Sequence, residues 1–248
     1  MHSHCNKALY KGLLARWHEK LCENDKSDII CYKKMLSNTS GKILQLGCGT
    51  GHLLVPLRQL GLDIEGLDSS DEMLAICLNK LENSKITKTA LYEQDMTDFE
   101  INKQYDIIFI SSGSFQFIID FDVALHCLKN IYNHLKTNGK FIVELLFMWD
   151  HISRNQDRLW VLTEEAENEA GERFLCYECA WFDIENQIKK SIFKFELYRN
   201  NKLVETEISN FYLRWYGKNE FKLILEKTGF SKIDMQAEND NALIYSAH

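Results

Sequence analysis

Between residues 42 and 147 the sequence alternates short apolar runs with amphipathic stretches. The runs that predict strands are KILQLG, DIEGLD, KTALYEQD, YDIIFI and KFIVELLF. The stretches that predict helices are HLLVPLRQLG, SDEMLAICLNKLEN and DVALHCLKNIYNHLK. Strands and helices in this order form parallel sheets with right-handed crossovers. The sequence therefore predicts an α/β, Rossmann-like fold, with a mostly parallel sheet and helices on both faces.

The segments on either side of this alternation have different patterns. Residues 6–36 predict an N-terminal helical cap. Three runs rich in β-branched and aromatic residues, RFLCYECAWFD, QIKKSIFKFELYR and KLVETEISNFYLRWY, predict an inserted antiparallel sheet. The acidic stretch TEEAENEAGER before them is expected to be a solvated helix or loop. A last helix, KNEFKLILEKTG, precedes two closing strands, FSKIDMQ and ALIYSA. We expect a core of residues 1–148 and 217–248, interrupted by an insertion over 149–216.

Composition limits the classes of partner. The formal charge is −7, and Lys and Arg are scattered, so neither nucleic acid nor an anionic membrane surface is expected as a partner. The N-terminus lacks the layout of a signal peptide, which predicts a cytoplasmic protein. The eight cysteines are expected to be free thiols. Cys176 and Cys179 would point to opposite faces of a strand, and no metal site is predicted.

Three glycines follow the first strand at alternate positions, in the sequence LGCGTG. Glycine permits positive φ and lacks the Cβ that would collide with a ligand lying across the turn. Gly47, Gly49 and Gly51 therefore favour a ligand pressed against the backbone, or else a tight strand-to-helix connection. A dinucleotide-binding loop would have a further glycine where His52 stands. This difference disfavours a nicotinamide oxidoreductase.

Acidic residues end the next two strands. Asp68 ends the second strand, 17 residues beyond Gly51, where a carboxylate can accept two hydrogen bonds from a ribose diol. The alternative is that Asp68 caps the following helix, although Ser69 or Ser70 could do so equally well. Asp95 and Met96 end the third strand, where they could accept from and donate to an adenine ring, or simply form a turn.

These motifs together resemble a known series. The stretches ILQLGCGTG, IEGLDSSDEML, YEQDM, YDIIFISSGSF and LKTNGKFIVEL resemble, in order and spacing, class I S-adenosylmethionine-dependent methyltransferases. The resemblance covers about residues 40–148, and EFKLILEKTGF is similar to the family's last helix and strand. It implies a seven-stranded sheet whose last strand is antiparallel. It also implies S-adenosylmethionine as the cofactor and S-adenosylhomocysteine as the product.

The resemblance implies a set of cofactor-binding residues. They are Gly47, Cys48, Gly49 and Gly51 along the methionine part, Asp68 at the ribose, Ser69 and Met73 beside the adenosine, Asp95 and Met96 at the adenine, Ser111 and Ser112 beneath the sulfonium, and Gln45 and Trp17. Two positions depart from the family. His18 stands where the family segment around Trp17 has tyrosine. Gln45 stands where the family has Asp or Glu to anchor the cofactor's amino group.

The departure at Gln45 leaves two interpretations open. An amide keeps a carbonyl acceptor but loses the charge, which costs ~1 kcal/mol of cofactor binding. The chain is then still a methyltransferase acting on N or O of a small-molecule acceptor by in-line methyl transfer. The alternative is a non-catalytic or weakly binding relative that acts as a partner protein.

The acceptor site is less defined by the sequence. A general base is needed only if the acceptor arrives protonated, and no residue is assigned that role. Candidates for it are His126, Asp150, His151 and Tyr216, with Asp150 and His151 ranked higher because they follow the fifth strand. Residues expected near the acceptor are Phe115, Trp149, His151, Trp215 and Tyr216. Aromatic stripes in the insertion are expected to pack the sheet, to cover an apolar acceptor, or to form a homodimer surface.

Overall fold

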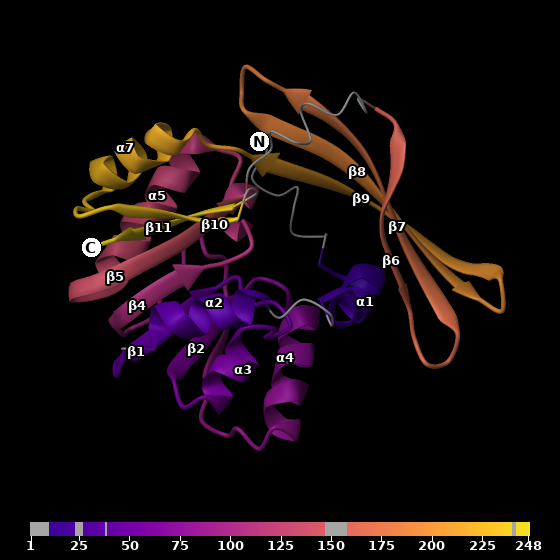
Figure 1. The fold of residues 1–248 in the computed structure, drawn as a ribbon, viewed down its shortest axis with the longest axis horizontal. Coiled ribbons are helices and arrows are strands. Elements are labelled where there is room, and N and C mark those ends of the chain that lie inside the picture. Colours follow the sequence, from indigo (N-terminus) through magenta and orange to yellow (C-terminus); the bar gives the residue numbers. More distant parts are fainter. Residues whose placement is uncertain (1–9, 23–26, 38, 147–157, 240–241) are drawn as a thin grey trace.

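A computed structural model describes residues 10–22, 27–37, 39–146, 158–239 and 242–248. Its helices are α1 (Gly12–Cys22), α2 (Ser27–Leu36), α3 (Leu54–Gln59), α4 (Asp71–Asn83), the 3-10 turn η1 (Ser114–Phe117), α5 (Phe121–His134) and α7 (Lys218–Thr228). Two separate sheets organise the chain (Figure 1). No helix in these ranges is long and apolar enough to cross a membrane.

The first sheet has seven strands in the order β10-β11-β5-β4-β1-β2-β3. They are β1 (Lys42–Leu46), β2 (Asp63–Asp68), β3 (Leu91–Glu93), β4 (Tyr105–Ile110), β5 (Leu135–Leu146), β10 (Asp234–Asn239) and β11 (Ala242–Ala247). Strand β11 is antiparallel to both neighbours, while β1 to β5 pair in parallel. The predicted seven-stranded, mostly parallel sheet with an antiparallel last strand is confirmed.

Helices cover both faces of this sheet, and each face has its own apolar cluster. On one face Tyr32 and Leu36 of α2 pack with residues of α3 and α4 against Ile43 and Phe109. On the other face side chains of α5 and α7 pack against Leu44 and the alternate residues of β4. Because strand side chains alternate between faces, both faces must be apolar for the strands to be covered on both sides. The reversal of strand order between β1 and β4 places the first glycine loop at the carboxyl edge of the sheet's middle.

The second sheet has four antiparallel strands, β6 (Trp160–Glu167), β7 (Glu172–Asp183), β8 (Ile188–Arg199) and β9 (Lys202–Arg214). Three of them are the predicted strands. The prediction of a helix or loop over the acidic stretch holds only for residues 168–171, which connect two strands. Residues 163–167 belong to β6, which pairs with β7. The edge strand β6 exposes its glutamates to solvent, and Glu165 pairs with Arg173 of β7 at 3.0 Å. Charged side chains are common on edge strands, which they protect from pairing with other chains.

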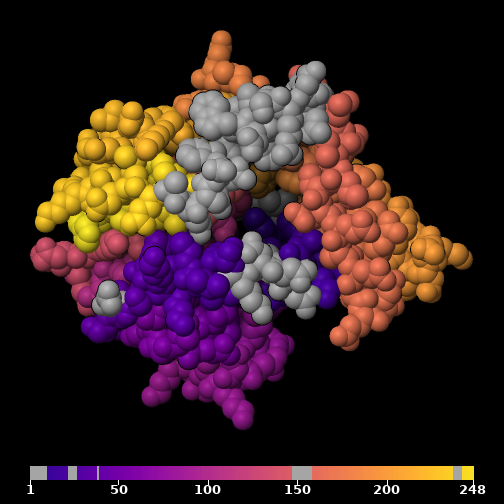
Figure 2. Space-filling model, viewed as in Figure 1, coloured from indigo at the N-terminus to yellow at the C-terminus, as the bar shows by residue number. Residues whose placement is uncertain are grey.

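Helix α1 lies between the two sheets (Figure 1). Its Leu13 and Trp17 are buried in the cluster on one face of the second sheet, where Trp17 stacks on Phe174 at a centroid distance of 5.5 Å. In the space-filling view the second sheet forms one flank of the molecule and the seven-stranded sheet with its helices forms the other (Figure 2). We call the face of the second sheet that packs on α1 its inner face.

Some boundaries differ from the expected ones. Within residues 6–36 the described residues form two helices, α1 and α2. Helix α5 ends at His134, before the end of the predicted stretch DVALHCLKNIYNHLK, and β5 begins at once with Leu135. Asn138 has φ of 63°, and the pairing of β5 with β4 shifts register in this part. Pro56 lies in the first turn of α3, where no helical N–H is needed.

Candidate functional site

The glycine loop leaves β1 at the carboxyl edge of the sheet. Gly47 and Gly49 have positive φ, of 69° and 52°. A Cβ on Gly47 would lie 3.2 Å from Cε of Met96 and 3.3 Å from Cβ of Ser114, and a Cβ on Gly49 would lie 3.4 Å from Cε of Met73. The loop, the end of β3, the start of α4 and the turn η1 therefore meet at one place. Side chains on these two glycines would fill it.

Gly51 and Cys48 have a different environment from the first two glycines. A Cβ on Gly51 would lie 2.6 Å from Sγ of Cys77, so α4 packs directly against this backbone. The side chain of Cys48 is buried, and its sulfur lies 2.7 Å from the position of a Cβ on Gly66. A hydrogen bond with Cys77, together with burial, keeps the pKa of Cys48 well above its usual value. Only the backbone of Cys48 can line a ligand, and glycine at position 51 serves the packing of α4.

Asp68 links the end of β2 to the glycine loop. Its carboxylate accepts hydrogen bonds from the backbone N–H of Gly49 at 2.8 Å and of Ser70 at 2.9 Å. Ser70, and not Asp68, caps α4 by accepting from the N–H of Met73 at 3.3 Å. A carboxylate offers about four acceptor positions, so capacity remains for a diol. Burial raises the pKa of Asp68, and the backbone N–H groups offset this only in part.

After β3, Asp95 and Met96 form the turn that was one of the two interpretations of these residues. Oδ1 of Asp95 accepts from the backbone N–H of Thr97 at 3.0 Å and from its hydroxyl at 2.7 Å, which forms a turn. The carbonyl of Met96 accepts from the thiol of Cys127 at 3.2 Å. This turn directs the Met96 side chain over Gly47, so the pair lies beside the loop as the sequence predicts. Ser69 lies next to Asp68 and is exposed.

Gln45 presents a buried acceptor at the same edge. Its side chain is 2% exposed, and Nε2 donates to Oγ of Ser111 at 3.3 Å. Its Oε1 is buried and has no hydrogen-bond partner in the part of the chain that the structure describes. A buried carbonyl left without a donor costs about 1–3 kcal/mol. A ligand that brings a positively charged N–H donor would remove this cost.

The loop after β4 is held by a residue that the sequence analysis missed. Ser112 has φ of 53°, and its backbone N–H donates to Oε2 of Glu144 at 2.8 Å. The hydroxyl of Tyr32 donates to the same oxygen at 3.2 Å. Glu144 is 7% exposed and lies near the carboxyl end of β5. The signal for it was present, because a single carboxylate in the apolar run FIVELL needs partners.

Helix α1 contacts the glycine loop through residues that follow Trp17. The hydroxyl of Thr50 donates to Glu19 and lies 3.3 Å from Nδ1 of His18, and Lys80 of α4 contacts Glu19 at 2.5 Å. Burial lowers the pKa of His18. Burial alone would raise the pKa of Glu19, but hydrogen bonds from Lys80 and Thr50 lower it. Trp17 itself faces the second sheet, so His18 and Glu19 are the α1 residues that reach the loop.

The residues expected near the acceptor separate into three groups. Phe115 is fully buried and packs with Tyr216 and Phe221 in the core of the first sheet. The hydroxyl of Tyr216 is buried without a partner among the described residues, and burial raises its pKa, which disfavours it as a base. Trp215 lies beside Phe182 at the end of the second sheet. Trp149, Asp150 and His151 fall outside the described residues.

The recorded contact of His126 is with a surface residue outside the glycine loop. His126 is an exposed residue of α5, and its Nε2 lies 3.2 Å from Asp98. This pairing on the surface gives it no place among the residues gathered around Gly47. The geometry brings together Gln45, Gly47, Gly49, Asp68, Met73, Met96 and Ser111.

With this geometry described, the chain can be compared with known proteins. Residues 43–139 match a family model described as a methyltransferase domain. This stretch is therefore similar to a methyltransferase domain. Outside the glycine loop, the matched stretch includes Gln45, Asp68, Asp95 and the Ser111–Ser112 pair, and it ends before the second sheet begins.

Proteins with similar sequences are also named as methyltransferases. A putative methyltransferase of Geobacillus is 30% identical over 159 residues, which are 61% of this chain and 63% of that protein. A malonyl-[acyl-carrier protein] O-methyltransferase of Bacillus anthracis is 28% identical over 109 residues, 43% of this chain and 38% of that protein. The chain therefore matches less than two thirds of the length of either relative.

Solved structures extend the likeness over the whole fold. An S-adenosylmethionine-dependent methyltransferase from Clostridium acetobutylicum has a TM-score of 0.75 at 22% identity, covering 94% of this chain and 96% of that one. The sugar N-methyltransferase KedS8 from Streptoalloteichus has a TM-score of 0.75 at 14% identity, covering 96% and 92%. At such identities the likeness concerns the fold. The chain has the fold of class I S-adenosylmethionine-dependent methyltransferases, with the matched stretch at its centre.

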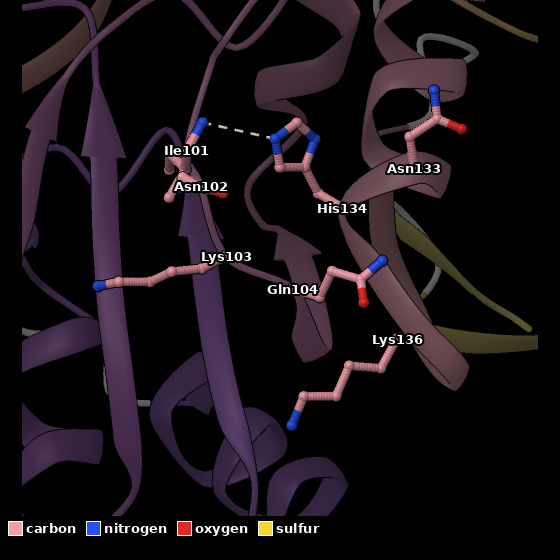
Figure 3. Close-up of a pocket in the computed structure, with 7 residues that line it drawn as sticks. All are labelled: Ile101, Asn102, Lys103, Gln104, Asn133, His134 and Lys136. Atoms are coloured by element: carbon pink, nitrogen blue, oxygen red, sulfur yellow. Dashed lines mark hydrogen bonds between the residues drawn. The ribbon is translucent and has the colours of Figure 1, made fainter.

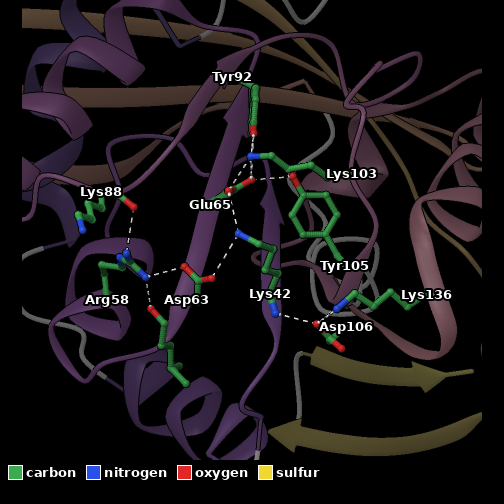
Figure 4. Close-up of polar contacts among 11 residues, drawn as sticks. Lys42, Arg58, Asp63, Glu65, Lys88, Tyr92, Lys103, Tyr105, Asp106 and Lys136 are labelled. Carbon is green, nitrogen blue, oxygen red and sulfur yellow. Dashed lines mark hydrogen bonds and ion pairs between the residues drawn. The ribbon is translucent and has the colours of Figure 1, made fainter.

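A hollow of about 470 Å³ lies at the other edge of the sheet, where β4 and β5 begin (Figure 3). It is lined by Ile101, Asn102, Lys103, Gln104, Asn133, His134 and Lys136. Both of its lysines are already paired, Lys103 with Glu65 at 2.9 Å and Lys136 with Asp106 at 2.8 Å. These pairs belong to a network that joins the starts of the strands (Figure 4). The hollow is therefore separate from the glycine loop.

Proposed function

We propose that this chain is an S-adenosylmethionine-dependent methyltransferase that acts on N or O of a small-molecule acceptor. The observation that carries the proposal is the buried Oε1 of Gln45 beside the glycine loop and Asp68, since this oxygen has no hydrogen-bond partner among the described residues. S-Adenosylmethionine has an ammonium group to donate to this oxygen and a ribose diol to donate to Asp68. The residues present therefore fit the cofactor, even though Gln45 lacks the charge of the family's Asp or Glu.

The roles of the chain's own residues follow from this fit. Gln45 would hold the amino group, Asp68 the ribose hydroxyls, and Asp95 with Met96 the adenine, while Gly47 and Gly49 admit the ligand. When bound, the cofactor supplies a methyl group on a positively charged sulfur. The protein then has to orient the acceptor and exclude water, and positioning alone can lower the barrier by about 7 kcal/mol or more. Helix α1, tied to the loop through Glu19 and Thr50, contributes to that exclusion.

The names of similar structures favour nitrogen of an amino sugar as the acceptor. They include the sugar N-methyltransferase KedS8 and CalS10, an amino pentose methyltransferase. Both have TM-scores of 0.67 or more and cover more than nine tenths of this chain, so the likeness includes the second sheet. The O-methyltransferase relatives match only about two fifths of the chain. In this chain the second sheet and α1 would lie over the acceptor.

Calorimetry with S-adenosylmethionine, S-adenosylhomocysteine and NAD tests the cofactor. We expect micromolar binding of the first two and none of NAD. Incubating the protein with S-adenosylmethionine and candidate acceptors, followed by mass spectrometry, then tests turnover through formation of S-adenosylhomocysteine and a methylated product. Binding without turnover on any acceptor would favour the non-catalytic alternative. Binding of NAD alone would overturn the proposal.

A further inference from the structure

A buried ion pair lies on the inner face of the second sheet. Lys189 of β8 contacts Oε1 of Glu178 on β7 at 2.7 Å, and the hydroxyl of Ser191 donates to the same oxygen at 2.6 Å. The two charged side chains are only 8% and 10% exposed. In every other ion pair among the described residues, at least one of the two side chains is more than 10% exposed. Burying two charges costs free energy that apolar residues would not, so their presence calls for a reason.

The position of this cluster connects it to the cofactor site. Ser191 lies opposite Phe211 of β9, and Phe193 lies opposite Glu178. Phe211 packs edge-on against Phe117 of η1 at 5.0 Å. The same turn η1 begins with Ser114, whose Cβ lies 3.3 Å from the position of a Cβ on Gly47. One 3-10 turn and one layer of aromatic rings therefore separate the charged cluster from the glycine loop.

A side-chain hydrogen bond fixes this arrangement. Gln116 of η1 is fully buried, and its Nε2 donates to the carbonyls of Leu146 on β5 and Arg214 on β9, at 3.1 and 3.2 Å. Leu146 returns a hydrogen bond from its N–H to Oε1 of Gln116 at 2.7 Å. Through Gln116, the end of β9 is therefore held next to the carboxyl end of β5 in the first sheet. The inner face and the cofactor loop form two sides of one region.

The chemistry of this region suits a hydroxylated ring. Phe117 and Phe193 both pack against Phe211, and each leaves part of its apolar surface exposed. Lys189 offers N–H donors, and among the described residues no hydrogen bond is recorded to Oε2 of Glu178, which remains able to accept. A ring with an apolar face and polar substituents can satisfy both kinds of surface. An acceptor without hydroxyl groups gains nothing from the charged pair.

We propose that Glu178, Lys189 and Ser191 form the polar end of the acceptor site and select a hydroxylated amine, of the amino sugar kind, over an apolar amine of the same ring size. The inference rests on the proposed methyltransferase function and names the residues that determine its specificity. A site built to hydrogen-bond a substrate hydroxyl rejects an analogue that lacks it far more strongly than an apolar pocket rejects a missing methylene. The three residues position and select the acceptor and take no part in the transfer itself.

The test compares two acceptor classes and three variants. The first acceptor class is a panel of amino sugars, namely D-glucosamine, D-galactosamine and their nucleoside-diphosphate forms. The second is cyclohexylamine, an amine on a six-membered ring without hydroxyl groups. The variants are Glu178→Gln, the charge-neutral double variant Glu178→Gln/Lys189→Gln, and Glu196→Gln as the control. Glu196 is equally buried and pairs with Lys194 at 2.8 Å, but on the opposite face of the sheet. Each variant is also titrated with S-adenosylhomocysteine and melted.

We expect the wild-type protein to methylate at least one amino sugar and to prefer it to cyclohexylamine. Glu178→Gln and the double variant should raise KM for that sugar tenfold or more, with a smaller change in kcat and with affinity for S-adenosylhomocysteine within twofold of wild type. Glu196→Gln should change neither. The double variant leaves no buried unpaired charge, so it keeps the test available if the single variant does not fold.

Three results would overturn the inference. The first is an unchanged KM for the sugar in the double variant. The second is a rise of KM in the variants that is equal for cyclohexylamine and the sugar, and the third is that the wild-type protein methylates another acceptor but no sugar of the panel. Failure of the proposed function looks different. In that case the wild-type protein either does not bind S-adenosylhomocysteine, or binds it and methylates no acceptor of any class.

Discussion

Two polar residues at the carboxyl edge of the sheet are arranged for a ligand at the expense of stability. The carboxylate of Asp68 is buried far enough to raise its pKa, and Oε1 of Gln45 is buried without a hydrogen-bond donor among the described residues. Neither arrangement favours folding, because both groups would be better solvated in the unfolded chain. Such groups are typical of binding sites, where the ligand supplies the missing partner.

Replacing Asp68 with asparagine should separate binding from stability. We expect affinity for S-adenosylhomocysteine to fall tenfold or more, since charge-assisted hydrogen bonds contribute roughly 1.5–3 kcal/mol. The free energy of unfolding at neutral pH should change less than the binding does, because removal of the buried charge offsets the loss of one of the two oxygens that accept from the N–H groups of Gly49 and Ser70. Calorimetry and thermal melting measure the two effects. A variant that binds as tightly as wild type would remove Asp68 from the site.

The raised pKa of Asp68 also predicts a dependence on pH. A group whose pKa is raised on folding holds its proton more tightly in the folded state, so acidification favours folding through this group. Protonation also removes an acceptor for the ribose. Affinity for S-adenosylhomocysteine should therefore begin to fall at a higher pH than an ordinary aspartate would give. The Asp68→Asn variant should lack this step in calorimetric titrations repeated across the acid range.

Replacing Gln45 with glutamate tests the missing charge. We expect binding of S-adenosylmethionine to tighten several-fold, about 1 kcal/mol, because the ammonium gains a charged partner. The protein without cofactor should melt at a lower temperature, since a carboxylate would be buried unpaired. Gln45→Ala is the matched control and should weaken binding. Unchanged affinity in both variants would show that the cofactor does not contact this position.

At the scale of elements, α1 joins the two sheets to the glycine loop. One side of the helix buries Leu13 and Trp17 against the second sheet, while Glu19 and His18 contact Thr50 of the loop. Arg16 adds a contact to Glu205 of β9 at 2.6 Å. The same helix therefore contacts both the second sheet and the backbone that would hold the cofactor.

Glu19→Gln should loosen this contact. The variant loses the charge that pairs with Lys80 and accepts from Thr50, so we expect S-adenosylhomocysteine to dissociate several-fold faster, with unchanged circular dichroism. The control is Lys11→Met, whose pair with Asp71 is exposed and contributes at most about 1 kcal/mol. Stopped-flow release of the ligand measures the rate. Equal rates in Glu19→Gln and wild type would contradict a role of α1 in retaining the cofactor.

At the scale of the whole molecule, the two ends of the strands in the seven-stranded sheet carry different groups of residues. The carboxyl edge collects the residues of the candidate site, and the opposite edge has a network of ion pairs and hydrogen bonds (Figure 4). At its centre Glu65 accepts from the hydroxyls of Tyr105 and Tyr92 at 2.7 and 2.9 Å and pairs with Lys103. This network joins β2, β3 and β4 and has no contact with the glycine loop.

Glu65→Gln should therefore destabilise the protein without affecting the site. We expect the free energy of unfolding to fall by about 1–3 kcal/mol, because the tyrosine hydroxyls and Lys103 lose their shared charged partner. Affinity for S-adenosylhomocysteine should stay within twofold. Denaturant unfolding and calorimetry measure both quantities. A large loss of cofactor affinity in a folded variant would mean that the two edges are coupled.

The same residue predicts how stability depends on acid. Burial alone would raise the pKa of Glu65, but hydrogen bonds from Lys103 and the two tyrosines lower it overall. A carboxylate with a lowered pKa contributes stability above its unfolded pKa and loses it as pH falls through the folded value. The wild-type protein should thus lose stability below about pH 4.5, the ordinary glutamate value, more steeply than Glu65→Gln. Melting across this pH range gives the comparison.

Local patterns in the chain were enough to predict the strands and helices of the first sheet. The strand Asp63–Asp68 and its apolar neighbours follow from periodicity, and the glycine loop follows from residues that permit positive φ. The antiparallel last strand came from the likeness to a family and not from local pattern. The edge strand β6 was missed because its glutamates face solvent and mask the alternation that marks a half-buried strand.

Contacts between residues distant in the chain required the folded structure. Nothing near Glu144 in the sequence shows that it holds the N–H of Ser112, nothing near Gly51 shows that Cys77 packs on it, and nothing in β7 alone shows that Glu178 meets Lys189. Periodicity is a property of neighbouring residues, whose backbone geometry it reflects. The partners of a buried polar side chain depend on which elements meet in space, and that is decided only when the whole chain packs.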